Sequence, residues 1–158
     1  MYPSHYIEFL AYFHGSRDYF ECHEVLEDYW KQSDPKNRDS VWVFLIQLSV
    51  GLYHYRRKNF KGADKLFKRC TSRIQMCRSE LIKIGLDADE LTAQLEDLNR
   101  SVQLEKAYRS VNLPIIDPSL KAQVIKRCQE MEHSFGNRDD SRNERIVHKH
   151  KTRKRTDH

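Results

Sequence analysis

The stretch from Ser40 to Lys58 constrains the fold more than any other part of the chain. Between Val41 and Tyr55, apolar residues occupy nearly every side of a helix drawn through the stretch. A helix that is apolar all round is normally surrounded by other helices. No segment shows the alternation of apolar and polar residues that a half-buried strand requires. The sequence therefore predicts an all-α protein with this helix at the centre of its core.

Apolar spacing predicts four to six helices in all. Helix starts are indicated by Ser4 and Asp18, and helix ends by Gly15, Pro35 and Gly85. Besides the central helix, we expect helices over residues 4–14, 18–32, 60–84, 88–102 and 119–134.

An internal repeat becomes visible when the chain is compared with itself so that Asp18 lies over Asn59. Residues 18–26 then align with residues 59–67, and Tyr12 aligns with Tyr53. In each copy a helix ends, an Asp or Asn begins the next, an aromatic residue follows, and a small residue comes three positions later. This pattern predicts a bundle of two repeated antiparallel helical hairpins followed by C-terminal helices. Tetratricopeptide-like packing is compatible with the second copy, although the two copies are spaced more widely than the usual period of that repeat.

The length of 158 residues fits a single domain, and its charge is unevenly distributed. The net charge is −4 for residues 1–39, +8 for 40–85, −4 for 86–144 and +5 for 145–158. The end of the chain has hardly any apolar side chain that could offset its ordering entropy. We therefore expect a helical domain over residues 1–135 and a disordered basic tail over residues 136–158.

The composition also bears on location and cofactors. No apolar run reaches the ~18 residues of a membrane span, and the start of the chain lacks signal-peptide features, so we expect a cytoplasmic protein without a membrane partner. The five glycines are isolated and form no phosphate-binding loop, so no cofactor is expected. The cysteines are scattered without a C-x-x-C pair, which favours reduced thiols at four positions: Cys22, Cys70, Cys77 and Cys128.

Several separated motifs between residues 5 and 84 resemble a family of bacterial and archaeal helical proteins. They are the run His23-Glu24-Val25-Leu26-Glu27-Asp28-Tyr29-Trp30 and then, in order, Phe44-Leu45-Ile46-Gln47-Leu48, Leu52-Tyr53-His54-Tyr55-Arg56-Arg57 and Asn59-Phe60-Lys61-Gly62-Ala63. The family is known as domain of unknown function 309. The resemblance implies an all-helical fold with hairpins and brings no established reaction, substrate or cofactor. Lys58 stands where members of the family often carry Gly, a departure that alters a turn.

Two stripes of polar and aromatic residues lie on the helices expected over residues 18–32 and 40–58. His23, Glu27 and Trp30 share one helix face, and Gln47 and His54 share another. If the stripes meet, they form a polar cluster within an apolar bundle. One interpretation is a hydrogen-bonded network that fixes how the hairpins dock. Another is a binding pocket for a small molecule or peptide.

A metal or acid–base site is a further interpretation of the same residues. It would use His23 and Glu27, with His54 as a third ligand. The zinc-protease signature H-E-x-x-H is broken here, because Glu27 stands in place of the second His. The E-x-x-H pattern of two-metal bundles occurs once, at Glu130 to His133, and two helices would need it.

A basic run follows the central helix and continues along the next one. A row of cations on a helix is typical of a surface that binds phosphates, although it is also compatible with a solvated face. The candidate anion-binding residues are Arg56, Arg57, Lys61, Lys65, Arg69 and Arg73, with Lys58 and Lys68 among them.

These patterns favour a non-enzymatic helical binding or scaffold module that holds a protein or peptide partner in the groove between its hairpins. One alternative is a metal-dependent enzyme centred on His23 and Glu27. Another is a nucleic-acid-associated protein that uses the basic helix and the tail. The sequence does not indicate an oligomeric state.

Overall fold

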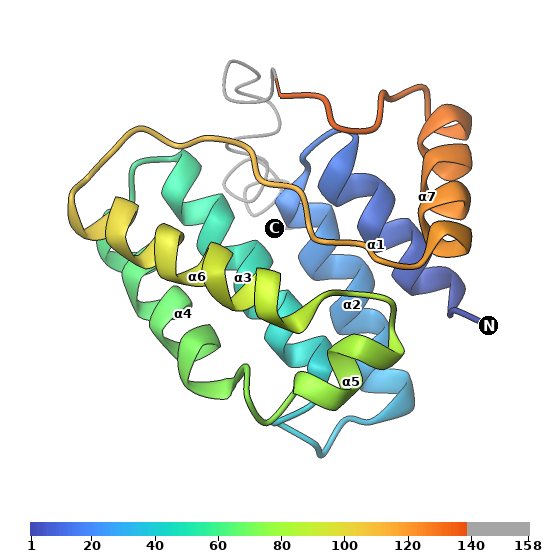
Figure 1. Ribbon diagram of the computed structural model, residues 1–158, viewed down its shortest axis with the longest axis horizontal. Coiled ribbons are helices and arrows are strands. Elements are labelled where there is room, and N and C mark those ends of the chain that lie inside the picture. Colours follow the sequence, from blue (N-terminus) through green and yellow to red (C-terminus); the bar gives the residue numbers. More distant parts are fainter. Residues whose placement is uncertain (139–158) are drawn as a thin grey trace, which may run out of the picture.

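The computed structural model of the protein describes residues 1–138 and confirms the all-α prediction over that range (Figure 1). The only extended pairing among these residues is an antiparallel bridge between Leu86 and Ile115. No helix in this part of the chain is long and apolar enough to cross a membrane. The helices are α1 (Ser4–His14), α2 (Tyr19–Ser33), α3 (Val41–Arg56), α4 (Phe60–Arg73), α5 (Arg78–Lys83), α6 (Ala88–Gln103) and α7 (Pro118–Glu130).

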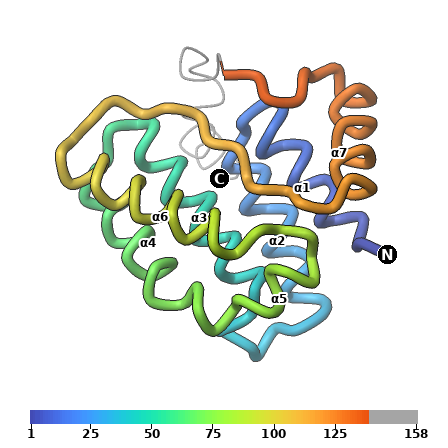
Figure 2. The backbone as a smooth tube through the Cα atoms, viewed as in Figure 1, coloured from blue at the N-terminus to red at the C-terminus, as the bar shows by residue number. Residues whose placement is uncertain are grey.

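Five helices form a layer in the order α4, α3, α2, α1 and α7 (Figure 1). On one face of this layer, α6 packs across α4, and α5 joins α4 to α6. The segment after α6 then runs back over the layer to reach α7, as the tube in Figure 2 shows. Because α3 lies between the two hairpins, it contributes most to the core, with Phe44, Leu45, Leu48 and Leu52 all almost fully buried.

The internal repeat is visible in the turn of each hairpin. Arg17 before α2 and Lys58 before α4 both have a left-handed backbone, with φ of 58° and 66°. The next residue caps the following helix in both copies: the Asp18 side chain accepts from the Glu21 N–H at 3.1 Å, and the Asn59 side chain from the Gly62 N–H at 3.2 Å. The small residues of the pattern, Cys22 and Ala63, are fully buried where the paired helices approach.

The single helix predicted over residues 60–84 is wrong, because the structure divides it into α4 and α5. Between them the chain tightens: the Met76 N–H donates to the Arg73 carbonyl at 3.0 Å, an i to i+3 bond, and the Cys77 N–H is shared between the Arg73 and Ile74 carbonyls. Ile74, Cys77 and Leu81 are nevertheless all buried. Apolar spacing therefore continues through the break and does not reveal it.

A buried arginine ties the end of the described chain to the first hairpin. The fully buried Arg17 side chain donates to the Val111 carbonyl at 2.5 Å, to the Asn112 side-chain oxygen at 2.7 Å and to the Asn137 carbonyl at 2.7 Å. The Gly136 N–H also donates to the His14 carbonyl at 2.7 Å. Gly136 and Asn137 of the predicted tail are thus bonded to the helical body, and residues 139–158 lie outside the described residues.

All four cysteines are free and buried. Burial raises the pKa of each thiol, that of Cys70 to about 12, so the cysteines act as small apolar core residues.

Candidate binding groove between the two hairpins

One face of α3 is not fully covered by its neighbours. Val43, Ile46, Gln47, Val50 and His54 follow one another at helical spacing, and all five are only half-buried. Cavities that these residues line also involve side chains of α2 on one side and of α4 on the other. We call this surface the inter-hairpin groove: its floor is the half-buried stripe of α3, and its walls are α2 and α4.

The α2 wall carries the His23 and Glu27 pair predicted from the sequence. His23 Nε2 lies 2.6 Å from Glu27 Oε2, His23 Nδ1 lies 3.4 Å from Glu24 Oε1, and Lys31 Nζ lies 2.7 Å from Glu27 Oε1. Lys31, and then His23, lower the pKa of the Glu27 carboxyl. These contacts all lie within α2, so they orient side chains along the wall and do not link α2 to α3.

At one end the groove deepens into a cavity of about 410 Å³. Trp30 borders it, with its indole N–H donating to the Asn37 carbonyl at 3.1 Å. The carbonyl oxygen of the Gln47 side chain is buried and accepts no hydrogen bond from the described chain. The lining residues are Glu27, Trp30, Arg38, Val43, Ile46, Gln47, Arg69 and Arg73.

A smaller hollow of about 170 Å³ lies at the other end of the floor. His23, Val50 and His54 line it together with aromatic side chains of the first residues of α2 and of Tyr53. His54 Nδ1 accepts from the Asn59 side-chain amide at 3.1 Å. The structure therefore places the five predicted cluster residues along one groove but in two hollows: His23 and His54 share one, and Glu27, Trp30 and Gln47 share the other.

The metal interpretation requires at least three ligating side chains to come together around one point. Within residues 1–138, no three His, Cys, Asp or Glu side chains come together in a group that could hold a metal ion.

The predicted anion-binding residues separate into internal and external ones. Arg56 is buried, donates to the Arg17 carbonyl at 2.7 Å and has its guanidinium 4.6 Å from the centre of the Tyr19 ring. Arg57 is half-buried over the Tyr53 ring, at 5.1 Å. Lys61 and Lys65 are exposed on α4, whereas Arg69 and Arg73 border the larger cavity of the groove.

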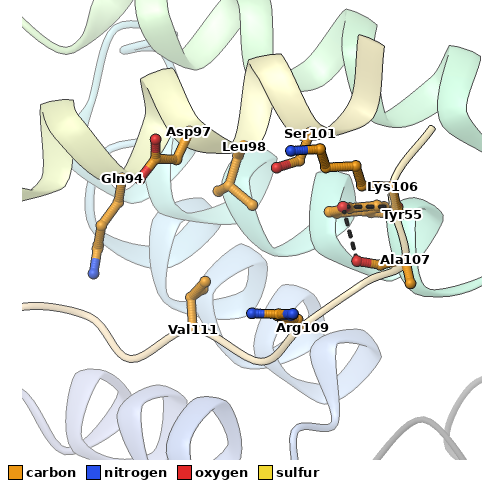
Figure 3. A pocket seen from close by; sticks show the side chains of 9 residues that line it. All are labelled: Tyr55, Gln94, Asp97, Leu98, Ser101, Lys106, Ala107, Arg109 and Val111. Atoms are coloured by element: carbon orange, nitrogen blue, oxygen red, sulfur yellow. Dashed lines mark hydrogen bonds between the residues drawn. The ribbon is translucent and has the colours of Figure 1, made fainter. Parts of the chain in front are cut away.

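The sequence did not indicate a cavity of about 580 Å³ beneath the segment that follows α6 (Figure 3). Side chains of α6 line one side and those of the connecting segment the other, and Tyr55 of α3 reaches in to donate to the Lys106 carbonyl at 2.9 Å. Gln94 donates to the Asn112 carbonyl at 2.8 Å. No motif pointed here, because the lining comes from three separate segments: Tyr55; Gln94, Asp97, Leu98 and Ser101; and Lys106, Ala107, Arg109 and Val111.

Comparison with known proteins finds a matching family model and a relative of nearly the same length. The model of the family described as "Domain of unknown function (DUF309)" matches residues 6–66, a range that includes both hairpin turns and the whole floor of the groove. A relative in Bacillus subtilis (strain 168), "Uncharacterized protein YpuF", is 39% identical over 157 residues, which is 99% of this chain and 90% of the relative. No solved structure matches the chain. The family model and the near-complete match to the relative lead to the same conclusion: this protein belongs to the DUF309 family.

Proposed function

We propose that the protein is a helical binding module that holds a segment of another protein in the inter-hairpin groove. The observation that carries this proposal is the half-buried apolar stripe on α3, formed by Val43, Ile46 and Val50. The other apolar faces of α3 pack into the core of the molecule. This stripe, in contrast, remains partly in contact with water, and it lies between the charged walls that α2 and α4 form. Covering it would release about 25 cal/mol for each Å² of apolar surface removed from water.

A second feature supports a partner with polar backbone or side-chain groups. The buried carbonyl oxygen of Gln47 accepts no hydrogen bond from residues 1–138. A buried acceptor that stays unsatisfied costs about 1 to 3 kcal/mol. An N–H group of a bound segment would satisfy this oxygen, whereas a purely apolar ligand would not.

The cavity under the segment after α6 is the competing site, and its tethers distinguish it from the groove. Tyr55 and Gln94 both donate to backbone carbonyls of the segment that forms its roof. Those bonds fix the roof against α3 and α6. The cavity is therefore the space left below a chain segment that is itself part of the fold. The inter-hairpin groove has no such roof among the described residues, and Val43 and Ile46 on its floor are only half-buried.

Site-specific photocross-linking tests the proposal. A benzophenone amino acid replaces Ile46 in the groove and, as the matched control, Ile82 on α5, which is 49% exposed. In the native cell, we expect position 46 to cross-link a protein that position 82 does not. A synthetic peptide that spans the cross-linked segment should then bind the purified protein, and Ile46→Gln should weaken that binding about tenfold while Ile82→Gln leaves it unchanged. Identical cross-links from both positions, or a peptide insensitive to Ile46→Gln, would contradict the proposal.

A further inference from the structure

We propose that the inter-hairpin groove selects an acidic segment, whose carboxylate is bound by Arg38, Arg69 and Arg73 at the larger cavity. This inference rests on the proposed function and names the chemistry of the partner. All three arginines border the same cavity as Trp30 and Gln47.

The larger cavity has more positive than negative side chains along its lining. Three arginines and one acidic residue, Glu27, border the cavity, and the Glu27 carboxylate is already in contact with His23 and Lys31. None of the three arginines forms an ion pair with another residue of the described range, although Lys68 on the same helix is paired with Asp64 at 2.8 Å. The cavity thus holds more positive charge than its own acidic residue balances, and this excess is complementary to an anion.

Two of the arginines are held in place by contacts within the protein. Arg73 Nη1 donates to the Arg38 carbonyl at 2.9 Å, which holds its side chain across the space between α4 and the loop after α2. The Arg38 guanidinium lies 6.0 Å from the centre of the Trp30 ring. Such contacts restrict the two side chains before a ligand arrives, and a guanidinium offers paired N–H donors that match the two oxygens of a carboxylate.

The surrounding groups favour a peptide over a nucleic acid. The opposite wall carries the carboxylate of Glu27, and that of Glu24 lies beside His23 on the same helix, so α2 would repel a continuous row of phosphates lying along the groove. An acidic segment can place its carboxylates toward α4 only and present apolar side chains to Val43 and Ile46. Its backbone or amide N–H groups can also reach the Gln47 oxygen, a partner that phosphate oxygens cannot provide.

Selection from a displayed library of random peptides, roughly 12 residues long, tests the inference against the purified full-length protein. We expect the selected peptides to be enriched in Asp and Glu. The best peptide should bind at least about tenfold more weakly to the double variant Arg69→Glu, Arg73→Glu. The control double variant Lys83→Glu, Lys126→Glu makes the same change in net charge at positions of α5 and α7 outside the groove and should keep the wild-type affinity. Replacing each Glu of the peptide by Gln should reproduce the loss.

The other outcomes separate the two claims. Neutral or basic selected peptides whose binding still depends on Ile46 would overturn the acidic-segment inference and leave the groove as a binding site. Failure to select any peptide, or selected peptides insensitive to Ile46→Gln, would overturn both. A fluorescein-labelled oligonucleotide, single-stranded or duplex, tests for nucleic-acid binding. If it binds the protein more tightly than the best peptide does, and loses affinity for the Arg69→Glu, Arg73→Glu variant, the ligand is a nucleic acid. The acidic-segment inference is then wrong.

Discussion

Arg17 and Lys58 occupy equivalent places in the two hairpins, each with a left-handed backbone directly before the residue that caps the next helix. Their side chains have opposite environments. Arg17 is fully buried and donates to three oxygens, whereas Lys58 is exposed. The left-handed residue therefore reinforces the turn with its side chain in the first hairpin but not in the second, where the Asn59 side chain bonds to Gly62 and His54 instead.

Substitution of Lys58 by Gly should stabilise the protein. A left-handed conformation costs a residue with a Cβ atom roughly 1 to 2 kcal/mol, and the greater freedom of Gly in the unfolded chain offsets about half of that gain. We expect Lys58→Gly to raise the free energy of unfolding by about 0.5 kcal/mol, measured by urea denaturation. A clear loss of stability would show that the Lys58 side chain contributes to the fold.

Arg17→Gly should have the opposite effect although the backbone conformation is the same. The substitution removes the donor from three oxygens and leaves a cavity, so we expect a loss of about 3 kcal/mol or more in the free energy of unfolding. Stabilisation comparable to that of Lys58→Gly would contradict the structural role assigned to the Arg17 side chain.

His14 should make stability depend on pH. Its Nδ1 donates to the Leu10 carbonyl at 2.8 Å and its Nε2 accepts from the Leu113 N–H at 2.9 Å, so the buried ring is neutral. Burial lowers its pKa to about 4, below that of the unfolded chain, so the unfolded state gains the proton first as pH falls. This contribution is complete above the unfolded pKa of about 6.5, and about 2 kcal/mol of it is lost between pH 7.5 and 5.

The slope should disappear in His14→Gln, which has no titrating ring. His5→Gln, at a partly exposed position of α1, is the matched control and should keep the slope. Denaturant unfolding at several pH values above 5 provides the measurement, and a wild-type slope in His14→Gln would assign the effect to other groups.

His23 and Glu27 should contribute little to stability. Their side chains are 28% and 32% exposed, and even a charged pair one helical turn apart at such a position contributes only about 0.3 to 0.5 kcal/mol. We expect His23→Ala and Glu27→Ala each to lower the free energy of unfolding by less than about 1 kcal/mol, with or without EDTA. Stoichiometric metal in the untagged wild type that is lost on His23→Ala would instead support the metal-dependent enzyme.

Two truncations should reveal the contribution of residues 136–138. A chain that ends at Phe135 lacks the Asn137 carbonyl that accepts from Arg17 and the Gly136 N–H that donates to His14. Compared with a chain that ends at Arg138, it should lose about 1 to 3 kcal/mol of stability, because a buried charged donor is left unsatisfied. Equal melting temperatures for the two chains would show that these bonds do not stabilise the fold.

The helices and the repeat could be predicted because they depend on local spacing and capping. Asp18 and Asn59, for example, are both N-caps as the repeat pattern indicates. The turn after Arg73 could not be predicted, because Ile74, Cys77 and Leu81 keep helical spacing through it. Such a break depends on how the chain must turn to bring α6 onto α4.

Part of the candidate site could also be predicted, because helical spacing shows which residues share a face of one helix. Spacing alone placed Gln47 and His54 on one face of α3, and His23, Glu27 and Trp30 on one face of α2. Spacing could not show that Arg38 and Arg73 reach the same cavity, because one lies in a loop and the other on α4. It also could not distinguish the buried Arg56 from the exposed Lys61, since both belong to one basic run.

The central claim, that the inter-hairpin groove binds an acidic segment, is tested most directly by NMR titration of the full-length protein labelled with ¹⁵N and at the methyl groups of Ile, Leu and Val. The titrant is the best acidic peptide from the library selection. We predict saturable shifts of the Val43, Ile46 and Val50 methyl signals and of the Trp30 indole N–H, and their absence in Arg69→Glu, Arg73→Glu. Shifts of Leu98 and Val111, which line the cavity under the segment after α6, with unchanged groove signals would contradict the account.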